Sequence, residues 1–333
     1  MKIKPKKILV IRLSSIGDVL LTTPVVKILK DEFPHAFFSF LVEDKSAGII
    51  SKNPHLDEVI TFSKKELKRV ACNKGKVSAF KYIINFIKKL NNKNFDLVID
   101  LHSVFRSGIF SFFTFADIKI GFKKQLISLL YTERLKHLSK EHVVDEYLST
   151  LKVLDIDYKN AEKEFTINIP DFKKNKIDKL FNKRSYEFKK KVAIVPSTSR
   201  AEKDWDETKF AKLADWLIKE KNIILFLLGS PSEKEKCLRI EEIMSQNPII
   251  LAGKTDLIEL AEVIRRLDLL ITGDTAPLHI AMALKTKLVG LYGPTSPKRY
   301  GPYQGNNLVI ESKNKNIDEI SIKEVKEKVD FLL

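Results

Sequence analysis

The sequence predicts an α/β protein built from two doubly wound domains in tandem. Short apolar runs of strand length alternate with longer amphipathic stretches along the whole chain. Such alternation is typical of parallel sheets whose strands are joined by right-handed helical crossovers. The 333 residues suffice for two domains of ordinary size. A lysine-dense stretch that is poor in apolar residues separates the two halves.

The first half is expected to hold one sheet and at least one long helix. Between residues 77 and 92 the apolar side chains recur at helical spacing, as at Phe80, Ile83 and Ile87, which predicts an amphipathic helix. The strand-like runs are 7–12, 37–43, 57–62, 95–102 and 117–122.

The second half repeats this scheme. Its strand-like runs are 191–196, 222–229, 247–251, 268–273 and 287–293, and helical patterns cover 207–220, 232–244, 256–266 and 277–285. The lysine-dense stretch 170–191 precedes the first of these strands, so we place the boundary near residues 183–190. The predicted domains are therefore 1–182 and 190–333.

Composition indicates a globular protein with a sizeable core, since 44% of the residues are hydrophobic and 31% are charged. No apolar run reaches the ~18–20 residues that a membrane-spanning helix needs. The N-terminus runs straight into a strand and lacks the small-residue cleavage site of a signal peptide. We therefore expect a cytoplasmic protein. Cys72 and Cys237 lie far apart and form no metal-binding motif, which predicts two thiols.

The positive charge is concentrated in the first half. Residues 1–180 hold 33 Lys and Arg against 21 Asp and Glu, whereas residues 181–333 hold 26 against 22. A basic half favours an anionic partner such as nucleic acid, a lipid headgroup or a phosphorylated glycan. A solvated charged surface would give the same composition, so charge alone leaves both open.

Chemistry in such sheets is expected in the loops that follow the carboxyl ends of the strands. The first of these loops reads Ser-Ser-Ile-Gly-Asp, residues 14–18. The further glycines of a dinucleotide-binding fingerprint are absent. Asp18 at a loop-to-helix junction is either an N-terminal helix cap or a general base.

Two loops of the second half carry hydroxyls and charges. In 195–210, Thr198, Ser199 and Lys203 precede a helix, and two hydroxyls with a lysine suit phosphate oxygens. Asp206 is expected to cap that helix. In 227–236, Glu233 is either part of a helix cap or a partner for ribose hydroxyls.

The segment 271–303 is the most specific. A strand ends at Thr272, and Asp274-Thr275-Ala276-Pro277 opens a helix with proline at a position that costs no hydrogen bond. The unsatisfied N–H groups of a helix start form an anion site. His279 in the first turn is either packed or a donor to a phosphate.

Together these segments closely resemble glycosyltransferase family 9, the heptosyltransferases, over nearly the whole chain. The stretches that carry the resemblance are RLSSIGDVLLTTP (12–24), FDLVIDLHSVFRSG (95–108), HVVDEYL (142–148), VPSTSRAEKDW (195–205), LLGSPSEKE (227–235) and TGDTAPLHIAMALKTKLVGLYGPTSP (272–297). Two positions depart from the family pattern: Ala276 stands where glycine is frequent, and Thr255 where a larger apolar residue can occur.

The resemblance implies a GT-B fold, in which two Rossmann-like domains face a cleft and the final helix, within 316–333, returns toward the first domain. It implies an inverting transfer of L-glycero-D-manno-heptose from ADP-heptose to the lipopolysaccharide inner core, on a Kdo or heptose unit of lipid A. No cofactor and no metal are required.

The resemblance also assigns roles to residues. It makes Asp18 the catalytic base. The donor-binding residues are Thr198, Ser199, Lys203, Glu233, Thr255, Asp274, Thr275, Ala276 and His279. The positive charge of the span 63–76 and the place of Arg106 after a strand add candidates for an anionic glycolipid, although a solvated charged surface would explain 63–76 equally well. The expected acceptor-binding residues are Ser15, Gly17, Arg106, Lys64, Lys65, Lys68 and Arg69.

The expected partners are therefore a nucleotide-sugar donor, an anionic glycolipid acceptor and the cytoplasmic face of the inner membrane, which a monomer would contact peripherally. A transferase of this family that uses another nucleotide-activated sugar is the alternative. A basic nucleic-acid-binding protein ranks low, because the sequence has no aromatic-rich stacking segment or nucleic-acid motif. A nucleotide-sugar epimerase shares the two-domain plan but not the Ser-Ser-x-Gly-Asp loop.

Overall fold

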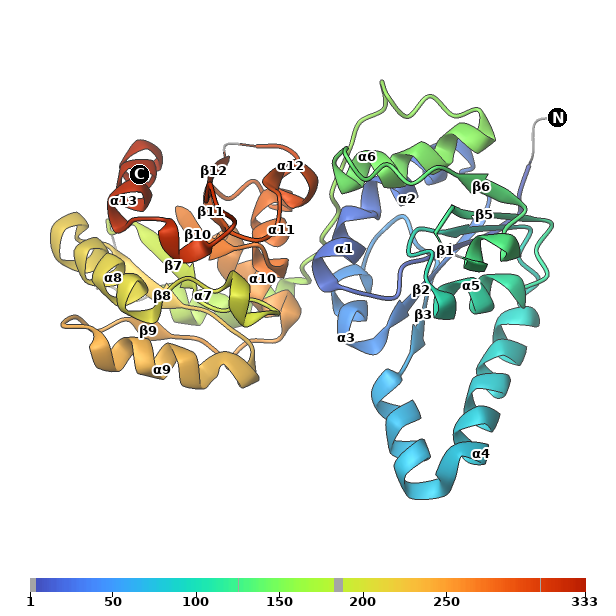
Figure 1. Ribbon diagram of the computed structural model, residues 1–333, viewed down its shortest axis with the longest axis horizontal. Coiled ribbons are helices and arrows are strands. Elements are labelled where there is room, and N and C mark those ends of the chain that lie inside the picture. The colour runs from blue at the N-terminus through green and yellow to red at the C-terminus, as the bar shows by residue number, and fades with distance from the viewer. Residues whose placement is uncertain (1–3, 125, 183–187, 306) are drawn as a thin grey trace. The chain divides into compact units, whose positions relative to one another are not determined.

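The computed structural model describes residues 4–124, 126–182, 188–305 and 307–333 (Figure 1). The chain forms two compact units, Met1–Asn168 and Ile169–Leu333. Each unit contains a six-stranded sheet in which every pair of neighbouring strands is parallel. The α/β class and the doubly wound plan predicted from the sequence are confirmed.

The first sheet has the strand order β3-β2-β1-β4-β5-β6. Its direction of winding reverses between β1 and β4, which are hydrogen-bonded neighbours, and a crevice for ligands forms at such a switch point. The strands are β1 (Lys7–Ile11), β2 (Phe37–Glu43), β3 (Glu58–Phe62), β4 (Leu97–Asp100), β5 (Ile118–Phe122) and β6 (Glu133–Leu135). The helices are α1 (Ile16–Leu21), α2 (Thr23–Glu32), α3 (Asp44–Ala47), α4 (Lys64–Asn91), α5 (Phe105–Phe112) and α6 (Val143–Leu148).

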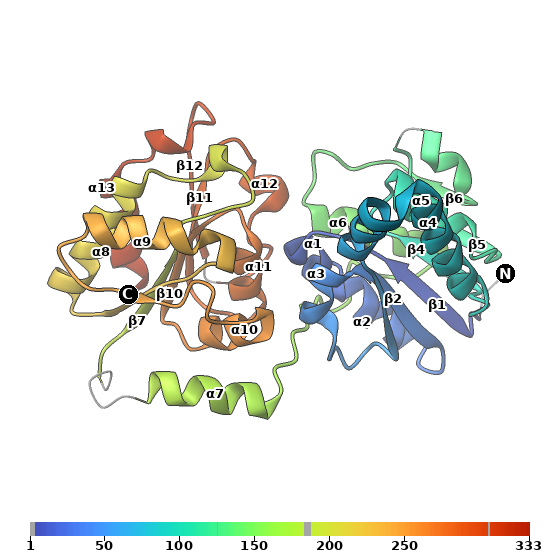
Figure 2. The same cartoon turned by 90° about the horizontal axis from the view of Figure 1, so that it is seen from below.

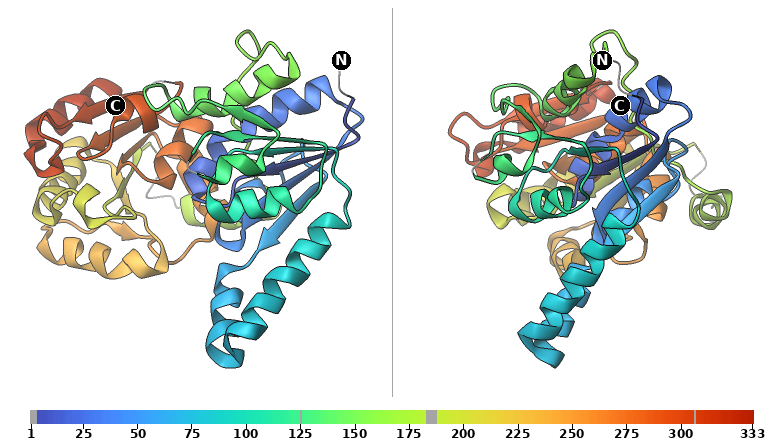
Figure 3. Two further views of the ribbon diagram at one scale, coloured as in Figure 1. Left: turned by 45° about the vertical axis from the view of Figure 1, so that its right-hand side comes forward. Right: turned by 90° about the vertical axis from the view of Figure 1, so that its right-hand side faces the viewer.

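Helix α4 is a bent hairpin that projects from the first unit (Figure 3). Gly75 adopts φ 78° and ψ 173°, a backbone conformation that residues with a side chain rarely adopt. The second arm contains the predicted helix 77–92. The first arm escaped prediction because charged side chains interrupt its few apolar ones. Its start is fixed by Ser63, whose hydroxyl accepts a hydrogen bond from the Glu66 amide at 3.1 Å.

The second arm of α4 is held to the sheet by aromatic packing. Phe86 lies 4.9 Å from Phe62 and 5.1 Å from Phe110 of α5, measured between ring centroids. Such pairs add about 0.5–1.5 kcal/mol each beyond the burial of their area. The arm and α5 are therefore fastened to β3 as one packed layer.

The second sheet repeats the same order as β12-β11-β10-β7-β8-β9, with its switch point between β7 and β10. Its strands are β7 (Lys191–Val195), β8 (Ile224–Leu227), β9 (Ile249–Ile250), β10 (Leu269–Gly273), β11 (Leu288–Tyr292) and β12 (Asn307–Glu311). Its helices are α7 (Asp171–Phe181), α8 (Glu207–Lys221), α9 (Lys234–Ile243), α10 (Leu257–Arg265), α11 (Ala276–Ala283), α12 (Pro297–Tyr300) and α13 (Ile322–Leu332).

The division between the units comes earlier than residue 182. Helix α7 belongs to the second unit (Figure 2), where Lys173 and Lys176 pair with Glu259 of α10 at 2.7 and 2.8 Å. Phe181 also stacks on Phe226 of β8 at 5.1 Å. Most of the predicted linker, 183–187, lies outside the described residues.

Helix α13 packs its apolar face, Val325, Val329 and Leu332, into the core of the second unit. Its return toward the first domain stays a prediction. Burying such side chains stabilises a fold by roughly 1.5–3 kcal/mol each. Within the described residues no helix is both long and apolar enough to cross a bilayer.

Candidate active site

The first cluster of functional side chains lies at the β1–β4 switch point. The Arg12 guanidinium follows β1 and is buried. Its Nη2 atom lies 2.9 Å from Oδ2 of Asp18, and its Nη1 atom donates to the Leu101 carbonyl just after β4, at 3.1 Å. Arg12 therefore ties the loop 14–18 to the carboxyl end of the neighbouring strand.

Asp18 lies in the first turn of α1 and takes part in its capping box, in which Ser15 is the N-cap residue. This agrees with the capping role that was one of the two interpretations of the sequence. Its Oδ2 atom accepts hydrogen bonds from the Ser15 amide at 3.3 Å and the Ser15 hydroxyl at 3.0 Å. The Oδ1 atom accepts a longer bond, 3.3 Å, from the Tyr147 hydroxyl of α6. The Asp18 side chain is 25% exposed. Capping by Oδ2 thus leaves Oδ1 as the oxygen that can take up a proton.

The charge on Asp18 is set by its neighbours. Burial alone would raise the pKa of Asp18, but the Arg12 guanidinium and the Ser15 hydrogen bonds outweigh it and lower the pKa to about 2. Asp18 is therefore an anion at every physiological pH.

Three cations act on His102, which lies near Asp18, and each of them also pairs with a carboxylate: Arg12 with Asp18, Arg106 with Glu43 and Lys124 with Glu146. His102, after β4, has its pKa lowered to about 3 by burial and by the nearby positive charges of Arg12, Lys124 and Arg106. The Nδ1 atom of His102 is buried and has no hydrogen-bond partner among the described residues. A neutral imidazole with one nitrogen that makes no hydrogen bond suits a polar ligand that can bond to it.

The predicted acceptor residues divide into two groups. Ser15 and Gly17 lie in the Asp18 loop, and Arg106 lies on α5, where it pairs with the buried Glu43 of β2 at 2.6 Å. The other four, Lys64, Lys65, Lys68 and Arg69, lie on the first arm of α4. Arg69 pairs with Glu66 of the same arm at 2.7 Å.

In the second unit, the β7–β10 switch point brings Lys203 and Asp274 together. The Lys203 Nζ atom lies 2.6 Å from Oδ2 of Asp274, and both side chains are largely buried. This approach depends on Gly273: a Cβ atom there would lie 2.9 Å from Thr198 Cγ2 and 3.3 Å from the Lys203 carbonyl oxygen. The glycine lets the loop after β7 close onto the end of β10.

Helix α11 starts beside this ion pair. Thr275 is its N-cap residue but makes no side-chain capping hydrogen bond, and Pro277 follows at the start of the helix. Ala276 opens the helix, and His279 is buried one turn in. The backbone dipoles of this eight-residue helix leave partial positive charge next to Lys203.

Thr198 is positioned by its own loop. Its amide donates to Asp204 at 2.7 Å and its hydroxyl to the Arg200 carbonyl at 2.8 Å, whereas Ser199 is exposed. Asp204 also pairs with Lys236 at 2.9 Å. Asp206 caps α8 through the Lys209 amide at 3.0 Å, as predicted.

Glu233 and Thr255 lie in adjoining loops. The Glu233 carboxylate accepts from the Ser230 amide at 2.6 Å, which is the capping role that the sequence left open. The Gly253 amide donates to the Gly229 carbonyl at 2.9 Å and so joins the two loops. Thr255 follows in the same turn.

Sequence reasoning missed four residues of these clusters. They are Arg12, His102, Tyr147 and Thr295, whose buried hydroxyl in the turn after β11 has no partner among the described residues. All four do occur in the stretches that carried the family resemblance. Their long-range contacts, such as that of Tyr147 with Asp18 across 129 positions, leave no local pattern.

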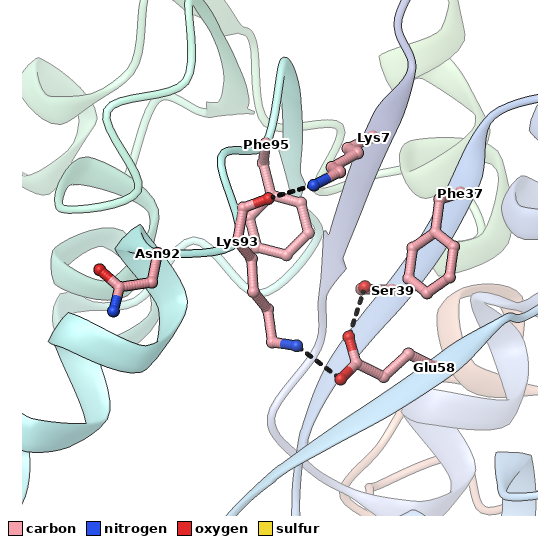
Figure 4. Close-up of a pocket in the computed structure, with 7 residues that line it drawn as sticks. All are labelled: Lys7, Phe37, Ser39, Glu58, Asn92, Lys93 and Phe95. Atoms are coloured by element: carbon pink, nitrogen blue, oxygen red, sulfur yellow. Dashed lines mark hydrogen bonds and ion pairs between the residues drawn. The ribbon is translucent and has the colours of Figure 1, made fainter.

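A cavity of about 340 Å³ at the opposite end of the first sheet carries no such chemistry (Figure 4). Four of its polar residues are joined by an ion pair and hydrogen bonds. Glu58 pairs with Lys93 at 2.6 Å and accepts from Ser39 at 3.0 Å, while Lys7 donates to the Lys93 carbonyl at 3.0 Å. These bonds link β1, β2 and β3 to the chain after α4, which is a structural role.

The chain is similar to known heptosyltransferases in sequence and in fold. The lipopolysaccharide core heptosyltransferase OpsX of Haemophilus influenzae is 27% identical over 94% of this chain and 86% of its own. Lipopolysaccharide heptosyltransferase 3 of Escherichia coli K12 is 30% identical over 87% and 83%. In structure, E. coli heptosyltransferase WaaC with ADP superposes with a TM-score of 0.80 at 22% identity, over 98% of this chain and 100% of its own, and supports a fold of the GT-B type. The sequence profile of glycosyltransferase family 9 (heptosyltransferase) matches residues 83–329, and the chain belongs to that family.

Proposed function

We propose that this enzyme transfers L-glycero-D-manno-heptose from ADP-heptose to the inner core of lipopolysaccharide, with inversion at the anomeric carbon. The observation that carries the proposal is the Arg12–Asp18 pair, an ionised carboxylate with one available oxygen at the switch point of the first sheet. The named activities of the relatives, lipopolysaccharide heptosyltransferases, support the choice of sugar and acceptor. The structural neighbour crystallised with ADP supports the nucleotide.

The chemistry is a single displacement. The acceptor hydroxyl attacks the anomeric carbon, and its proton passes to Oδ1 of Asp18. The bond between that carbon and the diphosphate oxygen breaks, and its electron pair leaves with ADP. Proton transfer of this kind contributes roughly 10²–10⁴-fold to the rate.

The second unit is proposed to stabilise the departing ADP. Lys203 supplies a positive charge, and the start of α11 supplies backbone N–H groups. Preorganised groups of this kind stabilise charge as it develops on a leaving group. Lys203 is already held in place by Asp274. In this proposal the lysine and helix start neutralise the diphosphate without a metal ion.

The decisive experiment compares Asp18→Asn and Lys203→Ala, measuring heptose transfer and ADP binding in each. Asp18→Asn should reduce kcat by roughly 10²-fold or more with an unchanged Kd for ADP. Lys203→Ala should weaken ADP binding by roughly ten-fold or more, because a charged hydrogen bond is lost. Lys219→Ala, an exposed position on α8, is the control. Normal turnover by Asp18→Asn would exclude Asp18 as the base.

A donor panel tests the sugar. ADP-heptose should give faster transfer than ADP-mannose or ADP-glucose on the same acceptor. Preference for a hexose donor would favour the alternative member of the family and end the heptose assignment. The proposal places the enzyme as a monomer on the cytoplasmic face of the inner membrane, where its glycolipid acceptor is anchored.

A further inference from the structure

The outer surface of the first unit carries an unusual group of exposed apolar side chains. Phe105 and Phe115 are 73% and 64% exposed, and Leu126 and Leu129 are 83% and 63% exposed. They lie on α5, on the turn after it, and on the 3₁₀ helix η2 (Leu126–Leu130), which contacts α5. Together with Phe112 and Phe113 they form what we call the α5–η2 face.

The aromatic part of this face is ordered. Phe112, Phe113 and Phe115 contact one another with ring centroids 5.2–6.5 Å apart. Along α5, Phe105 and Phe112 are separated by two helical turns and share one side of the helix. The opposite side is buried, with Phe110 packed on Phe62 at 5.1 Å. The helix is therefore apolar on both sides, whereas a surface helix usually carries polar residues on the side that faces water.

The segments that carry and adjoin the α5–η2 face are rich in lysine and arginine. Residues 101–136 contain six Lys and Arg against two acidic residues, Asp117 and Glu133. Lys119, beside the aromatic group, donates to the Ala116 carbonyl. Helix α4, which packs on α5 through Phe86, contains nine Lys and Arg against one Glu. Exposed phenylalanine and leucine among lysines match the interface of an anionic bilayer, where apolar rings enter the headgroup region and lysines contact the lipid charges.

We propose that the α5–η2 face docks this enzyme on an anionic lipid bilayer. A second copy of the chain fits the face less well, because it would bring two strongly basic surfaces together. The face starts at Phe105, at the beginning of α5 in the connection after β4, and the adjacent Arg106 is among the charges that act on His102. Docking there would hold a lipid-anchored acceptor beside the base; this functional consequence rests on the proposed function, whereas the docking itself does not.

The test uses the full-length protein and vesicles of phosphatidylcholine, with and without phosphatidylglycerol. The variant Phe105→Ser/Phe115→Asn/Leu126→Ser removes the apolar groups and keeps every charge. Phe172→Ser/Phe331→Ser, at exposed positions of the second unit, is the matched control. We expect the wild type and the control to sediment with the anionic vesicles and the triple variant to bind them at least roughly ten-fold more weakly, with unchanged thermal unfolding and ADP affinity.

Several outcomes would overturn the proposal. The first is that the wild type does not bind anionic vesicles, and the second is that the triple variant binds them as well as the wild type does. The third is a wild-type dimer that the triple substitution dissociates, which would assign the face to a second copy. Transfer assays separate this from the proposed function. The triple variant should lose activity on acceptor embedded in vesicles and keep it on a deacylated, water-soluble acceptor. Vesicle binding without heptose transfer by the wild type would refute the proposed function alone.

Discussion

The low pKa of Asp18 depends on Arg12. The two groups are 2.9 Å apart, and Arg12 is buried, so the pair is only weakly screened by solvent. A base with a pKa of about 2 holds a proton weakly. The acceptor proton would therefore reach Oδ1 late in the reaction, as the new glycosidic bond forms.

Replacing Arg12 should change the pH dependence of the reaction. In Arg12→Gln, burial without the guanidinium raises the pKa of Asp18 from about 2 to or above its usual value of ~3.9. The acidic limb of the kcat/KM profile should move to higher pH by about two units. An unchanged limb would show that another group sets it.

The same substitution should alter acid stability. A lowered carboxyl pKa stabilises the folded state above the unfolded pKa of ~3.9, and that stability is lost as the pH falls toward 2. The wild type should therefore lose about 2 kcal/mol of unfolding free energy over this window through Asp18. Denaturant unfolding between pH 5 and pH 2 should show a smaller loss in Arg12→Gln.

At the scale of elements, the loop after β7 reaches β10 only because residue 273 has no side chain. In Gly273→Ala, the new Cβ would lie 2.9 Å from Thr198 and 3.3 Å from the Lys203 carbonyl, so the loop must move away. Since β10 itself stays paired with β7 and β11, the fold should persist. Calorimetry should show ADP binding weakened by roughly ten-fold, with the circular dichroism spectrum unchanged.

The control for that experiment is Gly75→Ala. Gly75 also has a special role, at the bend of α4, but no atom lies within 4 Å of the Cβ it would gain. The positive φ should cost ~1 kcal/mol locally and raise hydrogen exchange in α4. Its affinity for ADP should match the wild type; a loss there would mean that the Gly273 effect is not specific to the loop.

At the scale of the whole molecule, the candidate functional residues are distributed over both units. The candidate base lies in the first unit, whereas Lys203, Asp274 and the start of α11 lie in the second. ADP at a concentration of 100 Kd should stabilise its binding unit by ~2.7 kcal/mol. Hydrogen exchange should show protection in the loops 196–206 and 274–279. Protection confined to residues 12–18 instead would place the nucleotide in the first unit.

The sequence by itself determined the class of fold and most of the strands. The run 37–43 was predicted to the residue, because a buried parallel strand is a continuous apolar run bounded by polar residues. The edge strands β6 and β12 were missed. At β6 two of the three residues are exposed, so an edge strand of this kind lacks the apolar pattern that identifies a central one.

The sequence also predicted which loops carry the candidate site residues, since parallel strands bring all their carboxyl ends to one edge of a sheet. Only the tertiary structure decided the state of each group. It pairs Asp18 with Arg12 and Tyr147, and Lys203 with Asp274. It also assigns α7 and α13 to the second unit. The reason is physical: strand and helix patterns are local, whereas a pKa, an ion pair or a docked helix depends on residues that only folding brings together.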